Sequence, residues 1–380
     1  MKKLLPLLLL LYPLLTAITT KAGGAPPSSF AWSPDGSQIA FAASGYAQDG
    51  ADLFVINADG TGYRNLTNRE YGLIFDETWS PDNKTLAFVA NGGDSETTPI
   101  YLLELHSGEV RTLSADQNIS GGLHWSPDGT QLAATTFGDL IIFEVASGGY
   151  IKMNADGRAR FVQWMDDNGF IYVHGVESVL HTYLCVAVDS CQRLPSDENI
   201  TAFPYLAWSP DGAQIAFSGK ATEADPLNVY IADPLGNIQQ HLTSAQTEYL
   251  INWLPDGKHI ISLITPADES SQSLWITPLD FPEGASQIYC GKWGLETVRL
   301  SPARDFLAFE AAGGQILIAS VTGETFYEVT AHGDYQWSPD GTRLAVYGDG
   351  REAEAVTIIE MATIDSSEFV IAPTEPTTCG

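Results

Sequence analysis

Short stretches in which apolar and polar residues alternate follow one another along most of the chain. The first unit reads SFAWS, the turn PDGS, QIAFAAS, DLFVINA, the turn DGTG and YRNLT, and the third reads GLHWS, QLAATTF, DLIIFEVA and YIKMN. Alternation with period two, bounded by Pro, Asp and Gly, predicts short β-strands joined by tight turns. Because no convincing helical period follows the first 22 residues, the pattern predicts an all-β fold.

The phrase WSPDG marks a repeated unit. Its copies, intact or degenerate, lie 37–47 residues apart, which brackets the period of roughly 40–45 residues expected of four-stranded propeller blades. We therefore predict an eight-bladed β-propeller with four antiparallel strands per blade over residues 29–370. A seven-bladed ring is the alternative, if the weak unit around Leu300 belongs to its neighbour. The aligned positions are Trp32, Trp79, Trp125, Trp164, Trp208, Trp253, Leu300 and Trp337.

The residues of the WSPDG phrase favour a turn and packing between blades. Pro presets φ, Asp accepts hydrogen bonds from nearby backbone and Gly adopts positive φ, so Pro-Asp-Gly favours a tight turn. The Trp before it is a large apolar side chain suited to packing between blades. The last unit reads DYQWS, RLAVYG, AVTIIEMA and EFVIA. We therefore expect it to be complete and the ring to close without an N-terminal strand.

The N-terminus has the pattern of a secretory signal peptide. Two lysines precede an apolar run over residues 4–18, and small residues follow. We expect cleavage after Ala22, with Ala17 as the second choice; an uncleaved anchor is the alternative. A cleaved signal predicts a periplasmic or extracellular protein without a membrane span. The expected divisions are the signal peptide at residues 1–22, a linker at 23–28, the propeller at 29–370 and a Pro/Thr-rich tail at 371–380.

Four cysteines in an exported chain suggest two disulfides. Cys185 and Cys191 flank a predicted turn, so they favour a local pair, and Cys290 would then pair with Cys379 in the tail. Free thiols are the alternative. The sequence contains no CxxC, and we predict no metal site and no cofactor.

The formal net charge is −29. Such a surface repels phosphate backbones, so nucleic acid is not an expected partner. The acidity is typical of a soluble exported protein, and we expect a monomer.

The stretch WSPDG…IAF…DLFVINADGTGYRNLT resembles the WD40-like repeat of TolB-type β-propellers. Related blades occur in the propeller domains of prolyl-oligopeptidase and dipeptidyl-peptidase enzymes. The resemblance covers about residues 29–370, without counterparts of the TolB N-terminal domain or of a peptidase domain. It therefore implies a fold and a binding role, and does not imply a catalytic activity.

Catalytic motifs are missing from the sequence. It has no G-x-S-x-G elbow and no HExxH. The segment DQNISG at residues 116–121 resembles half of a calcium loop, but its twelfth position is Pro127, where the loop needs Glu. We assign no catalytic residue.

Polar residues gather in the first strand of each unit. The position before the Trp is polar in six of the eight units, and strand alternation predicts that this set leans toward a central channel. We therefore predict a binding scaffold, without enzymatic activity, for a protein, peptide or glycan of the cell envelope. The alternative is a lyase or hydrolase with His124, Glu77, Arg299 and Asp334 in the channel. The ligand-binding candidates are Asp76, Glu77, His124, Gln163, Tyr205, Asn252, Glu296, Arg299 and Asp334.

Overall fold

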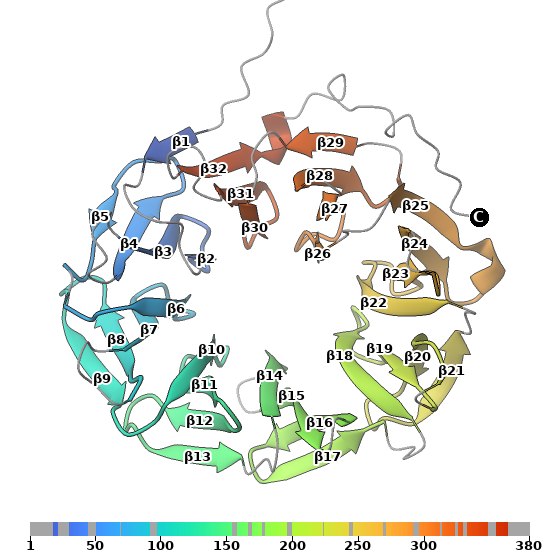
Figure 1. Cartoon of the computed structure of the whole chain (residues 1–380), viewed down its shortest axis with the longest axis horizontal. Helices are drawn as coiled ribbons and strands as arrows, with labels where there is room; N and C mark the ends of the chain where they lie inside the picture. Colours follow the sequence, from blue (N-terminus) through green and yellow to red (C-terminus); the bar gives the residue numbers. More distant parts are fainter. Residues whose placement is uncertain are drawn as a thin grey trace, which may run out of the picture.

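The computed structural model of the chain is a ring of eight four-stranded antiparallel sheets (Figure 1). The eight-bladed propeller with four antiparallel strands per blade is thereby confirmed, and the Leu300 unit forms a blade of its own. The structure describes residues 18–21, 30–44, 51–68, 70–91, 97–153, 158–165, 169–176, 179–195, 200–222, 224–242, 246–268, 271–291, 296–311, 314–323, 326–329, 333–348 and 355–363.

In the first four blades the strands follow the chain from the centre of the ring outward (Figure 1). Blade 1 contains β2 (Phe30–Trp32), β3 (Gln38–Ser44), β4 (Ala51–Asn57) and β5 (Arg64–Asn65). Blade 2 contains β6 (Ile74–Trp79), β7 (Thr85–Ala90), β8 (Ile100–Glu104) and β9 (Val110–Ser114). Blade 3 contains β10 (Ile119–Trp125), β11 (Gln131–Thr136), β12 (Leu140–Glu144) and β13 (Tyr150–Met153). Blade 4 contains β14 (Arg158–Trp164), β15 (Phe170–Val176), β16 (Val179–Ala187) and β17 (Ser190–Leu194).

Blades 5 to 7 keep this order, and blade 8 departs from it in its outermost strand. Blade 5 contains β18 (Thr201–Trp208), β19 (Ile215–Lys220), β20 (Asn228–Ala232) and β21 (Ile238–Leu242). Blade 6 contains β22 (Thr247–Trp253), β23 (His259–Thr265), β24 (Gln272–Pro278) and β25 (Ser286–Gly291), with the short helix η1 (Pro282–Gly284) before β25. Blade 7 contains β26 (Glu296–Leu300), β27 (Phe306–Ala311), β28 (Gln315–Ser320) and β29 (Phe326–Val329). Blade 8 contains β30 (Gly333–Trp337), β31 (Arg343–Gly348), β32 (Ala355–Glu360), followed by η2 (Met361–Thr363), and β1 (Ile18–Lys21).

Side chains of the repeated phrase hold the turn after the inner strand. In blade 1 the hydroxyl of Ser33 donates to Asp35 Oδ1 over 2.7 Å, and the same oxygen accepts the backbone N–H of Ser37 over 2.9 Å. In blade 8 the equivalent hydrogen bond from Ser338 holds the pKa of Asp340 below its usual value. The aspartates of the phrase therefore serve the turn, as expected for a folding motif.

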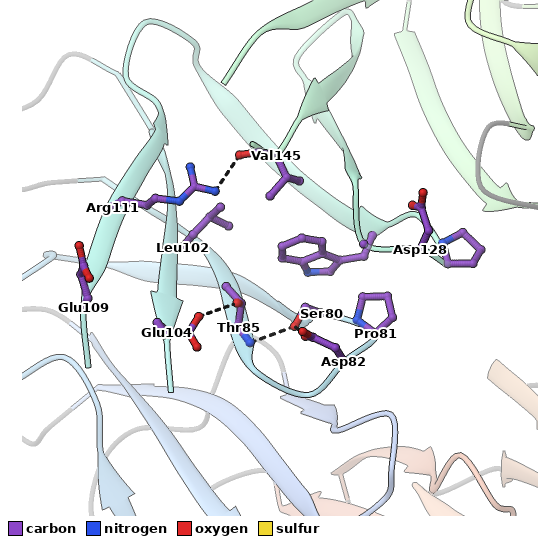
Figure 2. A pocket seen from close by; sticks show the side chains of 13 residues that line it. Ser80, Pro81, Asp82, Thr85, Leu102, Glu104, Glu109, Arg111, Asp128 and Val145 are labelled. Carbon is purple, nitrogen blue, oxygen red and sulfur yellow. Dashed lines mark hydrogen bonds between the residues drawn. The ribbon is translucent and has the colours of Figure 1, made fainter. Parts of the chain in front are cut away.

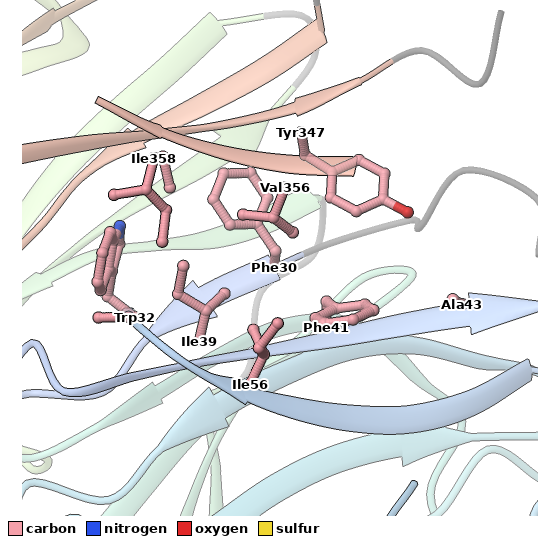
Figure 3. Packing of buried hydrophobic residues seen from close by; sticks show 11 residues of the cluster. Phe30, Trp32, Ile39, Phe41, Ala43, Ile56, Tyr347, Val356 and Ile358 are labelled. Atoms are coloured by element: carbon pink, nitrogen blue, oxygen red, sulfur yellow. The ribbon is translucent and has the colours of Figure 1, made fainter. Parts of the chain in front are cut away.

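Apolar clusters fill the eight interfaces between neighbouring blades. Figure 3 shows the interface at which the ring closes, where Trp32, Ile39 and Phe41 of blade 1 pack with Tyr347 and Ile358 of blade 8. Full burial of one such side chain contributes roughly 1.5–3 kcal/mol. The blades are thus held together mainly by these clusters, because no single four-stranded sheet has a core of its own.

Blade 8 corrects one sequence-based prediction. Its outer strand is β1, which pairs antiparallel with β32 so that Ile18 lies opposite Ile358 and Lys21 opposite Ala355 (Figure 1). The prediction that the ring closes without an N-terminal strand is therefore wrong. The segment expected in this position, EFVIA at residues 368–372, lies outside the described residues. Both segments are short and compatible with a strand, and the local pattern does not encode which of them reaches the edge of β32.

Candidate functional site

The first strand of each blade lies nearest the centre of the ring (Figure 1). In blades 1, 2, 3 and 8 the residue directly before the Trp is more exposed than the residue before that. In blade 3, for example, His124 is exposed and Leu123 is buried, and in blade 8 Gln336 is half-buried while Tyr335 is buried. This is the alternation expected of a pleated strand, and in these four blades it makes the residue before the Trp the more accessible of the two.

The tryptophans of the repeat hydrogen-bond each blade to the one before it. The indole N–H of Trp253, for example, donates over 2.9 Å to the carbonyl oxygen of Ala207, the residue before the tryptophan of blade 5. Five other repeat tryptophans make the equivalent bond, at 2.9–3.4 Å. The bonds join carbonyl groups of the inner strands, so they form a belt around the centre of the ring.

The belt is interrupted at two interfaces. The indole N–H of Trp208 in blade 5 is buried without a hydrogen-bond partner. In blade 7, Leu300 occupies the tryptophan position, and its side chain has no N–H group to donate. There the guanidinium of Arg304 reaches across from the following turn and donates to the carbonyl oxygen of Trp253 over 3.3 Å.

A cavity of about 510 Å³ lies at this second interruption, and we call it the blade 6–8 cavity. Leu300 and Trp337 form part of its wall, and Asn252 of blade 6 and Gln336 of blade 8 add amide groups. Its complete lining is Ile251, Asn252, Val298, Arg299, Leu300, Ser301, Pro302, Arg304, Gln336 and Trp337. The wall thus contains two arginines and no carboxylate, in a protein with 47 acidic and 18 basic residues.

Arg299 is anchored to blade 8 by both its side chain and its backbone. Its Nη2 lies 3.4 Å from Asp334 Oδ1, and its guanidinium carbon lies 5.7 Å from the centre of the Tyr335 ring. Its backbone carbonyl oxygen accepts the indole N–H of Trp337 over 3.1 Å. The side chain remains 39 % exposed, so it can still contact a ligand.

Arg304 occupies an unusual backbone position. It aligns with the Gly of the phrase and keeps that residue's left-handed conformation, with φ of 60° compared with 68° at Gly36 of blade 1. A bulky residue with positive φ is uncommon, and such strain costs on the order of 1 kcal/mol. Blade 7 therefore departs from the phrase at three positions, Leu300, Ala303 and Arg304. Two of these residues, Leu300 and Arg304, line the same cavity.

Residues 17–159 match the TolB beta propeller domain. Within these residues the chain carries the TolB-type propeller repeat. No sequence of a curated protein matches it.

Solved structures resemble the whole ring at low sequence identity. The C-terminal WD40 domain of Sif2 is 15 % identical, with 90 % of this chain and 98 % of that one covered and a TM-score of 0.58. An oligogalacturonate lyase in complex with manganese is 13 % identical, with 88 % and 98 % covered and a TM-score of 0.54. Porphyromonas gingivalis dipeptidyl peptidase 4 is 11 % identical, with 93 % and 60 % covered and a TM-score of 0.62. These likenesses support the fold and leave open whether it binds or catalyses.

Two of the predicted ligand-binding residues, Asp76 and Glu77, belong to the inner strand of blade 2. Asp76 Oδ2 accepts the backbone N–H of Leu123 over 3.2 Å, and burial raises the pKa of this carboxyl to about 6. Glu77 is 4 % exposed. Sequence alternation had already placed Glu77 in the packed set, and its burial agrees with that position.

Of the other predicted residues, Asn252 and Arg299 line one cavity, whereas His124 and Gln163 lie in blades 3 and 4. The ring of His124 stacks on Phe161 with centroids 4.7 Å apart. Gln163 is half-buried in blade 4, and Asn252 lines the blade 6–8 cavity. Within the described part of the set, the structure brings Arg299 and Asp334 into contact. Two further candidates, Tyr205 and Glu296, have side chains outside the described residues.

Sequence reasoning did not find a second cavity, of about 580 Å³, between blades 2 and 3 (Figure 2). The charged residues of its wall are acidic apart from Arg111. The guanidinium of Arg111 donates to the carbonyl oxygen of Val145 over 2.7 Å. Two of its carboxylates, Asp82 and Asp128, belong to turns of the repeat, and Ser80 holds the pKa of Asp82 low by hydrogen bonding. These groups already serve the fold, so this cavity is the weaker candidate.

The structure joins Cys185 to Cys191 in a disulfide across β16 and β17. Cys290 is also disulfide-bonded, while its expected partner Cys379 lies outside the described residues, so that pairing stays a prediction. The part of the chain that the structure describes has no cluster of three metal-binding side chains. Within the same residues, no helix has the length and apolar character needed to cross a bilayer.

Proposed function

We propose that this protein is an exported binding scaffold, without enzymatic activity, that takes a carboxylate group of its ligand into the blade 6–8 cavity. The observation that carries this proposal is that two of the departures of blade 7 from its own repeat line this cavity. Leu300 in place of Trp leaves room, and Arg304 in place of Gly adds a positive charge to the wall.

The chemistry of the wall suits a carboxylate. Guanidinium groups present planar donors that match the two oxygens of a carboxylate, and such charge-assisted hydrogen bonds are stronger than neutral ones. Asn252 and Gln336 add amide groups beside Arg299 and Arg304. Because the rest of the protein is strongly acidic, this local positive charge also favours a ligand that docks its carboxylate here and nowhere else on the ring.

The strain at Arg304 supports the same reading. Five other copies of the turn have Gly at this position, so Gly satisfies the fold without cost. Backbone strain of this kind is often found at functional sites. Arg304 contributes one hydrogen bond to Trp253, which a neutral donor could supply equally well. We infer that its charge serves a ligand.

The alternative of a lyase or hydrolase requires His124, Glu77, Arg299 and Asp334 to surround one reaction centre. Arg299 and Asp334 contact each other, whereas Glu77 is buried in blade 2 and His124 stacks on Phe161. This arrangement favours binding over catalysis. Cleavage of a bound ligand by the purified protein would reverse that preference.

The test measures binding of two carboxylate-bearing probes, an oligogalacturonate and a polyglutamate peptide, by calorimetry on the full chain. We expect one probe to bind and the other to bind weakly, which identifies the ligand as glycan or peptide. Arg304→Gly should weaken binding roughly tenfold or more, in line with the strength of a charge-assisted hydrogen bond. The same substitution should leave the protein as stable as before, because it relieves the strained φ.

Two matched controls separate this site from general effects of charge and turn geometry. Arg64→Gln removes one positive charge from the exposed outer strand of blade 1. Asn83→Gly changes the equivalent turn position in blade 2, where φ is 60°. Neither should change the affinity. If both probes fail to bind, or if Arg64→Gln weakens binding as much as Arg304→Gly, the carboxylate site is wrong.

A further inference from the structure

The strand β1 lies inside the segment that the sequence assigns to the signal peptide. Ile18–Lys21 pair with β32 along their whole length, with Thr19 opposite Thr357 and Thr20 opposite Val356 (Figure 1). The expected signal peptide covers residues 1–22, so cleavage after Ala22 would remove all of β1. The match to the TolB beta propeller domain also begins at residue 17, which includes this strand in the repeat.

Loss of β1 would leave an open edge on blade 8. Among the residues that the structure describes, every other blade has four strands of its own, and blade 8 reaches four through β1. Without it, the backbone N–H and C=O groups along the outer side of β32 would lack their partners, and an exposed edge of this kind invites pairing with other chains. The link between the two ends of the ring would also be lost, because the chain runs from β1 in blade 8 into β2 in blade 1.

An uncleaved anchor is also hard to reconcile with β1. With Ile18 at the start of the strand, the apolar run that could enter a bilayer shrinks to residues 4–17. That is 14 residues (17 − 4 + 1), whereas a spanning helix needs about 20. The remaining segment has the length of the apolar core of a cleavable signal, about 7–15 residues.

We propose that the signal peptide is cleaved between Ala17 and Ile18, so that the first residues of the mature protein form the strand that closes the ring. This inference rests on the expected signal peptide and is independent of the proposed ligand. Ala17 supplies the small residue required before the cut, although Leu15 fits the pattern less well than Thr20 does for cleavage after Ala22. The fold decides between the two sites, because only cleavage after Ala17 preserves all four strands of blade 8.

The first experiment exports the full chain with its own leader from a bacterial host and measures the intact mass of the mature protein. A chain that starts at Ile18 supports the proposal. A chain that starts at Gly23, or that retains Met1, overturns it.

The second experiment tests the position of the strand directly. Thr19→Cys combined with Thr357→Cys places two cysteines opposite each other, and a disulfide can join such neighbouring strands. We expect the cross-linked peptide in a non-reducing map of the exported protein. The control combines Thr20→Cys with Thr357→Cys, which are one residue out of register, and should give little of it. Equal cross-linking in both pairs, or none in the first, contradicts the assigned register.

The third experiment compares chains that begin at Ile18 and at Gly23. The shorter chain should unfold at a melting temperature lower by on the order of 5 °C, given the usual relation between lost stability and melting temperature. It should also associate at high concentration through the open edge of β32. A shorter chain with the same melting temperature and no association would show that the strand is dispensable and would overturn the proposal.

Discussion

The two interfaces of blade 6 are built from the same repeat position in different ways. Toward blade 5, Trp253 is fully buried and its indole donates to the carbonyl oxygen of Ala207. Toward blade 7, the equivalent position is Leu300, which is half-buried, and Arg304 takes over a hydrogen bond to blade 6. The first interface has a tryptophan in the repeat position and the second has a cavity lined by two arginines.

This difference teaches how a repeat protein can separate stability from function. Where the WSPDG phrase is intact, each of its residues stabilises the fold. Trp donates a hydrogen bond to the previous blade, Asp and Ser form the hydrogen bonds of the turn, and Gly adopts the left-handed conformation. Where a blade loses Trp and Gly, the neighbouring blades still hold it in place through the apolar clusters on both sides. The freed positions then become available for a ligand.

The largest expected effect comes from truncating the two equivalent residues of blades 6 and 7. Trp253→Ala should lower the free energy of unfolding by about 3–5 kcal/mol, because it opens a cavity in the core and breaks an indole hydrogen bond. Leu300→Ala should cost only about 1–2 kcal/mol, because Leu300 is already half-buried beside a cavity. Denaturant unfolding of both variants measures the difference. Equal losses would mean that the two interfaces are energetically alike.

A slightly smaller effect concerns the interface between blades 2 and 3. There the Asp76 carboxylate accepts the backbone N–H of Leu123, in addition to the indole hydrogen bond of Trp125. Its pKa is about 6 in the folded protein and 3.8 as the ordinary value. The folded state therefore binds the proton more tightly, and this contribution to stability is fully present below about pH 4 and is lost as pH rises through 6. The linkage amounts to up to about 3 kcal/mol.

Asp76→Asn should remove that pH dependence while it keeps an oxygen to accept the N–H of Leu123. The difference in unfolding free energy between the variant and the parent, measured from pH 4 to pH 7, isolates this group from the other carboxylates of the acidic surface. A difference that does not change with pH would contradict the raised pKa.

The hydrogen bond of the tryptophan belt can be tested apart from the apolar packing. Trp253→Phe should cost about 1–3 kcal/mol, because it leaves the buried carbonyl of Ala207 without its donor. Trp208→Phe is the matched change at an indole N–H that has no partner, so it loses packing area but no hydrogen bond. We expect the smaller loss at Trp208 in chemical denaturation. If Trp208→Phe lowers the free energy of unfolding as much as Trp253→Phe does, apolar packing alone accounts for the stabilisation by these tryptophans.

The smallest expected change in stability comes from restoring the repeat tryptophan in blade 7. Leu300→Trp can fill the blade 6–8 cavity and offer an indole N–H to blade 6, so stability should change by no more than about 1 kcal/mol in either direction, as gained contacts offset overpacking. Binding of the carboxylate probe should be lost, since the bulky ring occupies the site. Undiminished affinity in this variant would place the ligand elsewhere.

Part of the candidate site could be predicted from the sequence. The position before the repeat Trp pointed to Asn252 and Arg299, which the fold brings to one cavity. Strand alternation, continued along the same strand, also predicted Asp76 near the channel, but its carboxylate accepts a backbone N–H of blade 3. It passed over Arg304, although an arginine in the glycine position of a degenerate turn was visible in RLSPARD. Position along a strand indicates accessibility, but only the packing of neighbouring blades shows whether a polar group already has a hydrogen-bond partner within the fold.

The sequence by itself determined the repeating unit of this protein: its strands, its turns and the interfaces that tryptophan fills. These follow from contacts between residues that are near in sequence or one repeat apart, so a periodic pattern records them. The tertiary structure alone decided that Ile18–Lys21 complete blade 8 and that residues of blades 6, 7 and 8 share one cavity. Both depend on how the ring closes and on which groups three blades bring together, and such long-range geometry leaves no periodic trace in the sequence.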